Sequence, residues 1–306
     1  MTSTTTVLLC TYNGGNHLHQ QLDSVLNQSI DNINVLASDD GSSDNTLAIL
    51  KKYKLSWTKG YFKILAGPQK GFAENFLSLT YKAKADSDYF AFCDQDDIWK
   101  KDKLKRAIKF LKSKEKTPAL YCSRTEMINE LGTSINQLSP LFKKKPSFAN
   151  AIVQSIAGGN TMVLNSRALN LIRAARLRKV VSHDWWTYML VTGAGGSVFY
   201  DPEPSLLYRQ HANNLIGANG NFSARMKRLR MLIKGEFRDW TSLHIKALQD
   251  NQALLNKANK KILENITFSQ QESLLKRVSS FKKSNAYRQT MPGNIALWIA
   301  VLLKKL

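Results

Sequence analysis

Short apolar runs alternate with helical patterns through the first 125 residues of this 306-residue chain. Each run ends in turn-forming polar residues and precedes apolar positions at the spacing of an amphipathic helix. The pattern predicts strands at 7–10, 33–37, 61–65, 89–93 and 119–122. It predicts helices between them over 18–26, after Asp44, over 71–84 and over 103–111. Strands separated by such helices form βαβ units, so we expect an α/β fold with a mainly parallel sheet flanked by helices.

Three of these strands end in clusters of polar residues. The clusters are Thr11–Gly15, Ser38–Gly41 and Asp94–Asp97. In parallel sheets, ligands bind beyond the carboxyl ends of the strands. We therefore expect the three clusters to converge on one crevice.

The pattern also divides the chain by region. Between 130 and 220 it is less regular, with further strand-like segments at 161–164, 197–200 and 206–207. We expect one domain over 1–220, with a first half over 1–125 and a second half over 126–220. Beyond 220 the sequence is helical in pattern and basic, with seventeen Lys and Arg against five Asp and Glu. The segment 221–306 is thus expected to be a basic helical extension.

Composition narrows the possible partners and the compartment. A hydrophobic content of 43% argues against wholesale disorder, and the net charge of +21 favours polyanionic partners such as nucleic acid, anionic lipid or phosphorylated substrates. We expect Cys10, Cys93 and Cys122 to be buried free thiols, which suits a reducing compartment. The sequence predicts no signal peptide and no apolar run long enough to span a membrane, so we expect a cytoplasmic protein.

Asp94 and Asp96 follow an apolar strand and emerge on the same side of the chain. Paired carboxylates that leave most of a coordination shell open suit Mg²⁺ or Mn²⁺ shared with a diphosphate. Such a metal neutralises a leaving diphosphate. The alternative interpretation is a solvated acidic turn before the next helix.

Three motifs in the first third of the chain resemble those of glycosyltransferase family 2. They are Thr11-Tyr12-Asn13, the segment Asp39–Asp44, and Asp94-Gln95-Asp96-Asp97. The resemblance implies the GT-A fold, which is related to the Rossmann fold. It makes 1–220 the catalytic domain, with a nucleotide-sugar half over about 1–125 and an acceptor half over about 126–220. A turn-forming role remains open for Asp39-Asp40-Gly41.

The resemblance also implies roles for the donor-side residues. Thr11, Tyr12 and Asn13 would line the nucleotide pocket, and Asp40 or its neighbour Asp39 would hydrogen-bond the base. Further along, the resemblance implies that Asp94 approaches the ribose, that Asp96 and Asp94 bind the metal, and that Arg209 and His211 supply charge toward the metal or diphosphate. A surface pair is the alternative for Arg209 and His211.

Asp184 lies in the segment His183-Asp184-Trp185-Trp186. By resemblance to inverting members of the family, it would be the general base that takes the proton of the acceptor hydroxyl. The alternative is an N-cap for a helix beginning at Trp185.

The acceptor side is expected to comprise His183, Trp185 and Trp186 together with the loop Gly158-Gly159-Asn160, where glycines allow close backbone approach. A plain turn is the alternative for that loop.

The motifs together are similar to those of bacterial rhamnosyltransferases that build O-antigen and other surface polysaccharides, over roughly residues 5–216. This resemblance implies an inverting transfer of L-rhamnose from dTDP-L-rhamnose onto a lipid-linked saccharide. Alternatives are a UDP-hexose or UDP-galactofuranose donor, or a basic protein that binds nucleic acid or membrane without catalysis. No recognised nucleic-acid module is present, so we expect no nucleic-acid partner.

The basic extension suggests where the protein contacts a membrane. Basic and apolar residues interleave over 225–234, and the apolar run 295–303 precedes Lys304 and Lys305. Such segments lie on anionic membrane surfaces, which predicts a peripheral protein at the inner face of the cell membrane. The alternative is a helical cap that packs on the catalytic domain and exposes a basic face.

Overall fold

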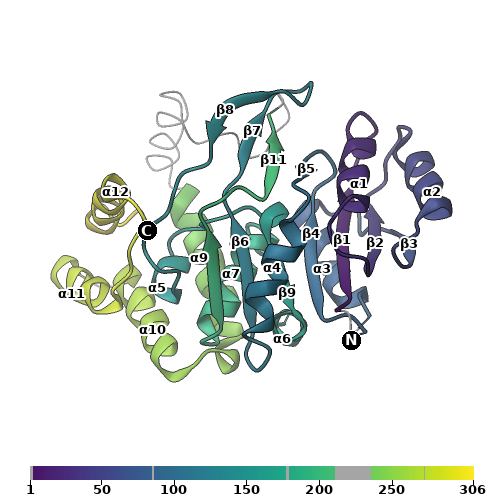
Figure 1. The fold of residues 1–306 in the computed structure, drawn as a ribbon. Coiled ribbons are helices and arrows are strands. Elements are labelled where there is room, and N and C mark those ends of the chain that lie inside the picture. Colours follow the sequence, from purple (N-terminus) through teal and green to yellow (C-terminus); the bar gives the residue numbers. More distant parts are fainter. Residues whose placement is uncertain (1–2, 85, 177–178, 211–235, 272) are drawn as a thin grey trace.

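The computed structural model covers residues 1–306 and describes 3–84, 86–176, 179–210, 236–271 and 273–306. At its centre lies a seven-stranded sheet with the order β10-β6-β9-β4-β1-β2-β3 (Figure 1). Its strands are β1 Thr5–Thr11, β2 Ile33–Asp39, β3 Phe62–Ala66, β4 Tyr89–Cys93, β6 Ala119–Ser123, β9 Val163–Asn165 and β10 Ser197–Asp201. All five strands expected before residue 125 are present, which confirms that part of the prediction.

The sheet is parallel except for β9, which runs antiparallel to both β4 and β6. The strand order reverses at β1, because β2 and β3 extend the sheet on one side while β4 lies on the other. A reversal of this kind opens a crevice at the carboxyl ends of the two diverging strands, here β1 and β4.

Successive residues of the strands enter two different hydrophobic clusters. In β1, Val7 and Leu9 face α1 Leu18–Leu26, α2 Thr46–Ser56 and α4 Lys103–Lys112, whereas Leu8 and Cys10 face the opposite layer. That layer contains α3 Phe72–Lys82, α6 Ser166–Ala174 and α7 His183–Gly193. A strand buried on both faces needs an unbroken apolar run, which explains the pattern of the sequence.

A second, four-stranded sheet has the order β5-β11-β7-β8. Its strands are β5 Ile98–Trp99, β7 Glu126–Ile128, β8 Ser134–Leu138 and β11 Leu206–Arg209. Only β11 was expected from the sequence. The second sheet brings β11 beside β5, which directly follows the acidic cluster at 94–97.

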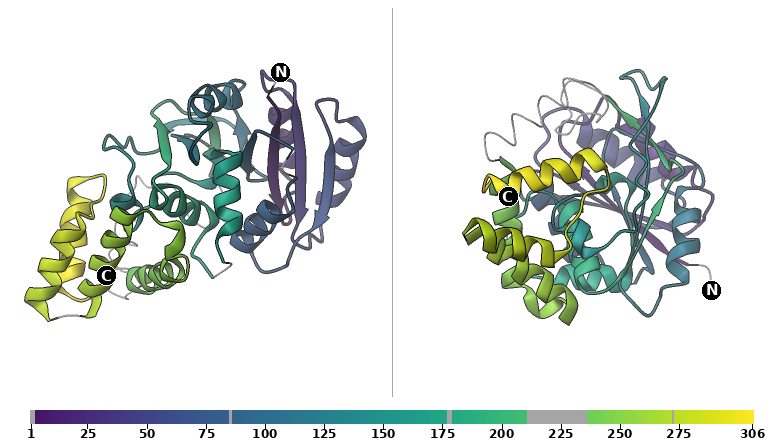
Figure 2. Two further views of the ribbon diagram at one scale, coloured as in Figure 1. Left: turned by 90° about the horizontal axis from the view of Figure 1, so that it is seen from below. Right: turned by 90° about the vertical axis from the view of Figure 1, so that its left-hand side faces the viewer.

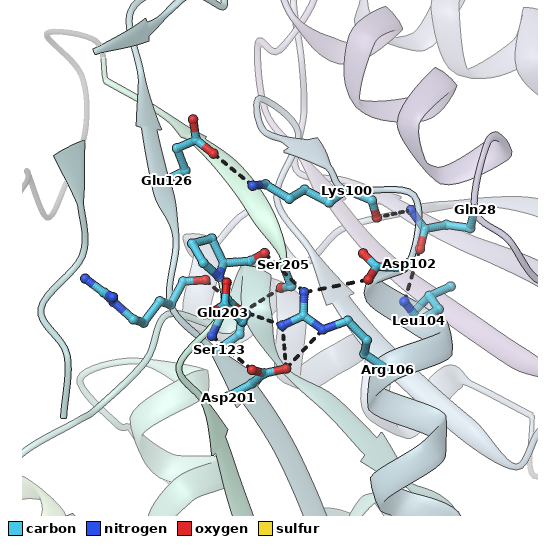
Figure 3. Close-up of polar contacts among 12 residues, drawn as sticks. Gln28, Lys100, Asp102, Leu104, Arg106, Ser123, Glu126, Asp201, Glu203 and Ser205 are labelled. Carbon is cyan, nitrogen blue, oxygen red and sulfur yellow. Dashed lines mark hydrogen bonds and ion pairs between the residues drawn. The ribbon is translucent and has the colours of Figure 1, made fainter. Parts of the chain in front are cut away.

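Ion pairs and hydrogen bonds join α4 to the end of β10 and the segment after β5 to β7 (Figure 3). Arg106 of α4 donates to Asp201 at the end of β10 through Nε, at 3.1 Å, and through Nη2. Lys100 forms an ion pair of 2.8 Å with Glu126 of β7. These contacts hold β10, β7 and the segment after β5 in one framework.

The described part of the C-terminal region is mainly helical, as expected. Its helices are α9 Glu236–Asp250, α10 Lys257–Gln271, α11 Leu274–Ser284 and α12 Met291–Leu302. They lie on the β10 side of the molecule, across the sheet from β3 (Figures 1 and 2). Leu248, Ile266, Phe281 and Val301 join the same hydrophobic cluster as Leu8 of β1.

These helices therefore cap the α7 layer, as in the second interpretation of the extension. The basic segment 225–234 and the expected boundary at 220 lie outside the described residues. Among the described helices, none is both long and apolar enough to cross a bilayer. All three cysteines are buried and free, as expected.

Candidate active site

The polar clusters at the strand ends converge, as expected, at the crevice between β1 and β4. The loop after β1 contacts the loop after β2 through Asn13, whose Oδ1 accepts a hydrogen bond of 2.9 Å from the Ser43 amide. Asn13 adopts the left-handed region with φ of 48°, a conformation that asparagine tolerates better than most residues. The same loop contacts the loop after β4 through Gln95, which bonds both the amide (2.8 Å) and the carbonyl (3.0 Å) of Tyr12.

Asp39 and Asp40 both bond to nearby loops. Asp39 is buried and accepts hydrogen bonds from the hydroxyls of Thr11, at 2.9 Å, and Ser42, at 2.5 Å. Asp40 accepts from the amides of Gln69 and Gly71, at 2.6 and 3.2 Å, in the loop before α3. The two carboxylates thus shape the nucleotide-side loops, and their predicted contact with a base stays a prediction.

The acidic cluster after β4 concentrates negative charge. Burial raises the pKa of Asp94, and repulsion from Asp97, Asp96 and Asp184 raises it further. Burial also raises the pKa of Asp97 to about 7, with the charge of Asp96 adding to the effect. The neighbouring charges thus disfavour the ionised forms of Asp94 and Asp97, and a cation beside them would relieve that repulsion.

The residues present fit a divalent cation that is shared with a substrate. Asp94 and Asp96 offer carboxylate oxygens, the donors that Mg²⁺ and Mn²⁺ prefer. Within the described residues, no three His, Cys, Asp or Glu side chains are grouped closely enough to hold a metal by themselves. Donor phosphate oxygens and water would therefore complete the shell. His211, the third predicted ligand, lies outside the described residues.

Asp184 lies in the first turn of α7. The helix begins at His183 with Ser182 as its N-cap, so the interpretation of Asp184 as the N-cap is wrong. Its Oδ2 accepts a hydrogen bond of 3.1 Å from the Gly159 amide, and its Oδ1 accepts one of 2.7 Å from the Trp185 amide. Two backbone donors fix the carboxylate at one end of the acidic cluster.

The aromatic residues around Asp184 point in different directions. His183 is buried, stacks on Phe76 at a centroid distance of 3.9 Å, and packs edge-on against Phe92. Burial lowers the pKa of His183 to about 4, with the Asp184 charge opposing the shift, so the ring is neutral at pH 7. The half-buried Trp185 donates a 2.7 Å hydrogen bond to the Ala151 carbonyl, and Trp186 is buried in the core. Acceptor contacts of these residues stay predictions.

Arg209, predicted on the donor side, is almost fully buried at the end of β11. Its guanidinium donates to the carbonyls of Asp96 (2.8 Å) and Glu130 (2.6 Å) and to the side chain of Gln20 (2.5 Å). Arg209 thus stabilises the loop that carries Asp96 through a hydrogen bond to its backbone. Direct contact with the donor stays a prediction.

Sequence reasoning gave no role to three further residues of the site. Asp97 and Lys103 are fully buried beside Asp94 and Asp96. Burial raises the pKa of Tyr208, and the charges of Asp97, Asp94, Asp96 and Asp184 raise it further. The sequence offered one signal for Asp97, which lies inside the quoted motif Asp94-Gln95-Asp96-Asp97.

Comparisons with known proteins agree with this geometry. The chain matches Glycosyl transferase family 2 over residues 6–170. It is 30% identical over 269 residues to the dTDP-rhamnosyl transferase RfbG of Shigella flexneri, covering 84% of this chain and 90% of that protein.

Solved structures show the same architecture at low sequence identity. S. aureus TarS 1–349 in complex with UDP-GlcNAc is similar with a TM-score of 0.55 and 15% identity, covering 92% of this chain and 90% of that one. The mannosyltransferase PcManGT of Pyrobaculum calidifontis, in complex with GDP-Man and Mn²⁺, has a TM-score of 0.51 and 15% identity, covering 100% and 86%.

The chain therefore belongs to glycosyl transferase family 2 and is a glycosyltransferase. Its fold is the predicted GT-A type, with a mixed, mainly parallel sheet flanked by helices.

Proposed function

We propose that this enzyme transfers L-rhamnose from dTDP-L-rhamnose, with inversion, onto a saccharide acceptor in surface polysaccharide synthesis. The observation that carries the proposal is the position of Asp94 and Asp96 directly after β4, where the charge of Asp184 also raises the pKa of Asp94. The sugar and nucleotide are inferred from the similarity to RfbG, which is described as a dTDP-rhamnosyl transferase.

The donor lies across the crevice in this proposal. Its nucleotide contacts the loops at Thr11–Asn13 and Asp39–Asp40, and Asp94 approaches the ribose. Asp96 and Asp94 hold a Mg²⁺ or Mn²⁺ ion, which neutralises charge on the diphosphate when bound. Arg209 stabilises the loop that carries Asp96 by donating to the Asp96 carbonyl.

Asp184 is the general base in this proposal. The acceptor hydroxyl oxygen attacks the anomeric carbon, and its proton passes to the Asp184 carboxylate. The bond from that carbon to the diphosphate oxygen breaks at the same time, and dTDP leaves with the electron pair. Gly159 and Trp185 hold the carboxylate through one oxygen each.

The donor assignment is tested by calorimetric titration with dTDP, UDP and GDP, each with and without Mn²⁺. A metal-dependent preference for dTDP, together with turnover of dTDP-L-rhamnose, would support the proposal. A preference for UDP would keep the family and replace rhamnose with a hexose or galactofuranose donor. If none of the three bound, the crevice would not be a donor site.

We further propose that the acceptor is lipid-linked and that the enzyme works at the inner face of the cell membrane. Met291, Ile295, Trp298, Ile299 and Leu302 form an exposed stripe along α12, spaced as one helical face. Exposed apolar stripes of this kind mark interaction surfaces. Lys304 and Lys305 follow directly, and a net charge of +21 favours anionic lipid while repelling a second copy of the chain.

Vesicle binding tests this location. We expect the protein to co-sediment with vesicles of phosphatidylglycerol and phosphatidylethanolamine but not with pure phosphatidylcholine. The double variant Ile295→Asp, Ile299→Asp should lose binding, while Leu55→Asp, at an exposed leucine of α2, should bind like wild type. Unchanged binding by the double variant would overturn the assignment, as would light scattering that shows a dimer held by the stripe.

A further inference from the structure

One short turn contacts both halves of the active site. The 3₁₀ turn η1, Gly159–Thr161, follows Gly158 and precedes β9. The Gly159 amide donates to Asp184, the proposed base, over 3.1 Å. The next residue, Asn160, donates through Nδ2 to Oδ2 of Asp97 over 2.6 Å. Adjacent residues of η1 thus bond the base and the acidic cluster.

Asn160 is held on its other side by Lys103. The Lys103 side chain is fully buried, and its Nζ donates to the Asn160 carbonyl while lying 3.5 Å from the centroid of the Trp99 ring. A buried ammonium group is costly unless nearby negative charge and hydrogen bonds compensate it. Asp97 and Asp94 supply that charge, so Lys103 and the acidic cluster stabilise each other around Asn160.

Packing leaves the turn little freedom to move. Asn160 is only 4% exposed, and Asp97 is completely buried with its Oδ1 accepting from the Arg209 amide at 3.3 Å. A Cβ atom at Gly159 would lie 2.3 Å from Nε2 of His183, so only glycine allows η1 to approach α7 this closely.

We propose that Asn160 is a positioning residue that holds the base, Asp184, at a fixed distance from the metal-binding carboxylates, with Lys103 anchoring its backbone. The inference rests on the proposed function, because it assumes that Asp184 takes the acceptor proton. Direct displacement requires the acceptor oxygen, the anomeric carbon and the leaving oxygen to lie in line. A misplacement of about 1 Å can slow such a step by roughly 10²-fold.

The test exchanges the two partners of the Asn160–Asp97 hydrogen bond. In Asn160→Asp alone, the amide donor is lost and two carboxyl groups face each other, so rates are measured at alkaline pH, where both groups ionise and share no proton. We expect kcat to fall about 10- to 100-fold, while dTDP still binds at one site per chain with Mn²⁺. In the double variant Asp97→Asn, Asn160→Asp, the new amide at 97 donates to the new carboxylate at 160 and still accepts from the Arg209 amide. We expect it to recover most of kcat.

A control separates positioning from general damage. Asn165→Asp alters another buried asparagine, whose amide donates to the Lys114 and Thr117 carbonyls away from the site. It should lower Tm without lowering kcat of the folded protein. The proposal is overturned if Asn160→Asp keeps wild-type kcat, or if the exchanged variant folds and binds dTDP but stays slow.

Rates are compared with the donor that the wild-type enzyme uses. A wrong donor assignment would be seen as a different donor preference of the wild-type enzyme. A wrong positioning role would be seen only in the kcat values of the variants relative to wild type. An Asp184→Asn variant with wild-type turnover would identify failure of the proposed base separately.

Discussion

At the scale of single residues, the carboxylates of the site differ in what already surrounds them. Asp39 accepts from two hydroxyls and from loop amides, whereas Asp40 and Asp184 each accept one backbone amide on each oxygen. A carboxylate has about four lone-pair sites, so Asp184 retains acceptor capacity for a substrate hydroxyl. Asp184 is a stronger candidate for proton transfer than Asp40 because its charge acts on Asp94 at the proposed metal site.

Asp184→Asn should separate chemistry from donor binding. The amide keeps an oxygen for one backbone donor but cannot take a proton, so we expect turnover to fall about 10²–10⁴-fold. The calorimetric affinity for dTDP with Mn²⁺ should stay close to that of wild type. A loss of donor affinity without a loss of kcat would indicate a structural role instead.

Asp96→Ala should abolish metal-dependent turnover without unfolding the protein. Removal of one of two carboxylate ligands weakens the site, and the side chain is half-buried and lies outside the hydrophobic clusters. The measurement is rate against Mn²⁺ concentration, with chelation of the metal as a parallel test on wild type. Asp102→Ala, at an exposed carboxylate shortly after the cluster, should behave like wild type. Normal turnover in the Asp96 variant would refute the metal assignment.

Two buried histidines should make the fold sensitive to acid. Burial lowers the pKa of His183 to about 4 and that of His244 to about 3, against about 6.5 when unfolded. The unfolded state therefore binds more protons below pH 6.5, and the free energy of unfolding should fall as pH drops from 6.5 toward 4.

His244→Phe tests this dependence, because the ring can keep its packing against Trp185 at 4.6 Å. Its unfolding free energy, measured in urea at pH 4.5 and 7, should change less between the two pH values than that of wild type. The variant can lose at most about 1.4 kcal/mol of this pH dependence for each unit by which folding lowers the pKa of His244. An identical pH dependence would show that His244 is not the source.

At the scale of elements, strands that are buried on both faces were predictable and the small sheet was not. β1, β2 and β4 are buried along their whole length, and each contains a run of apolar residues that identifies it as a strand. β8 is exposed along its whole length and β5 has two residues, so neither produces a periodic hydrophobic pattern in the sequence. β5 is positioned by pairing with the distant β11, which local patterns do not encode, and β8 pairs with the nearby β7 but buries no side chain.

The same limit applied to the site. Loops after predicted strands located Asp94, Asp96 and the residues near Asn13, because parallel topology alone brings strand ends together. Lys103 and Asp97 were missed as site residues because their roles depend on contacts with Asn160, which is 57 residues from Lys103 in sequence. Charge on a predicted helix normally indicates a solvated face, and burial reverses that expectation.

Arg277 should stabilise the C-terminal helix pair. From α11, its Nη1 donates to the carbonyls of Val301 and Leu302, at 3.2 and 3.1 Å, at the end of α12. A cation at a helix C-terminus interacts favourably with the unpaired carbonyls and the helix dipole. We expect Arg277→Met to lower the free energy of unfolding by about 1–3 kcal/mol, measured in urea. Lys282→Met, on an exposed position of the same helix, should change it by less than about 0.5 kcal/mol.

At the scale of the whole molecule, the helices after residue 235 are joined to the sheet rather than appended to it. Asn259 donates to the Thr192 and Gly193 carbonyls at the end of α7, and Asn150 of the short helix α5, Phe148–Ala151, donates to the Tyr287 carbonyl. The shared hydrophobic cluster runs from β1 to α12. Elements that share one core lose their partners together, so the sheet and these helices should unfold as one unit.

Calorimetry tests this cooperativity. The intact chain should unfold in a single transition whose calorimetric and van't Hoff enthalpies agree. Deleting 291–306 uncovers Phe281 and removes the partners of Arg277, so the transition of the remaining chain should move to lower temperature. An independent extension would instead give two transitions in the intact chain and an unchanged main transition after the deletion. The single-transition outcome would mean that contacts made at α12, including contacts with lipid, can alter the stability of the layer that carries Asp184.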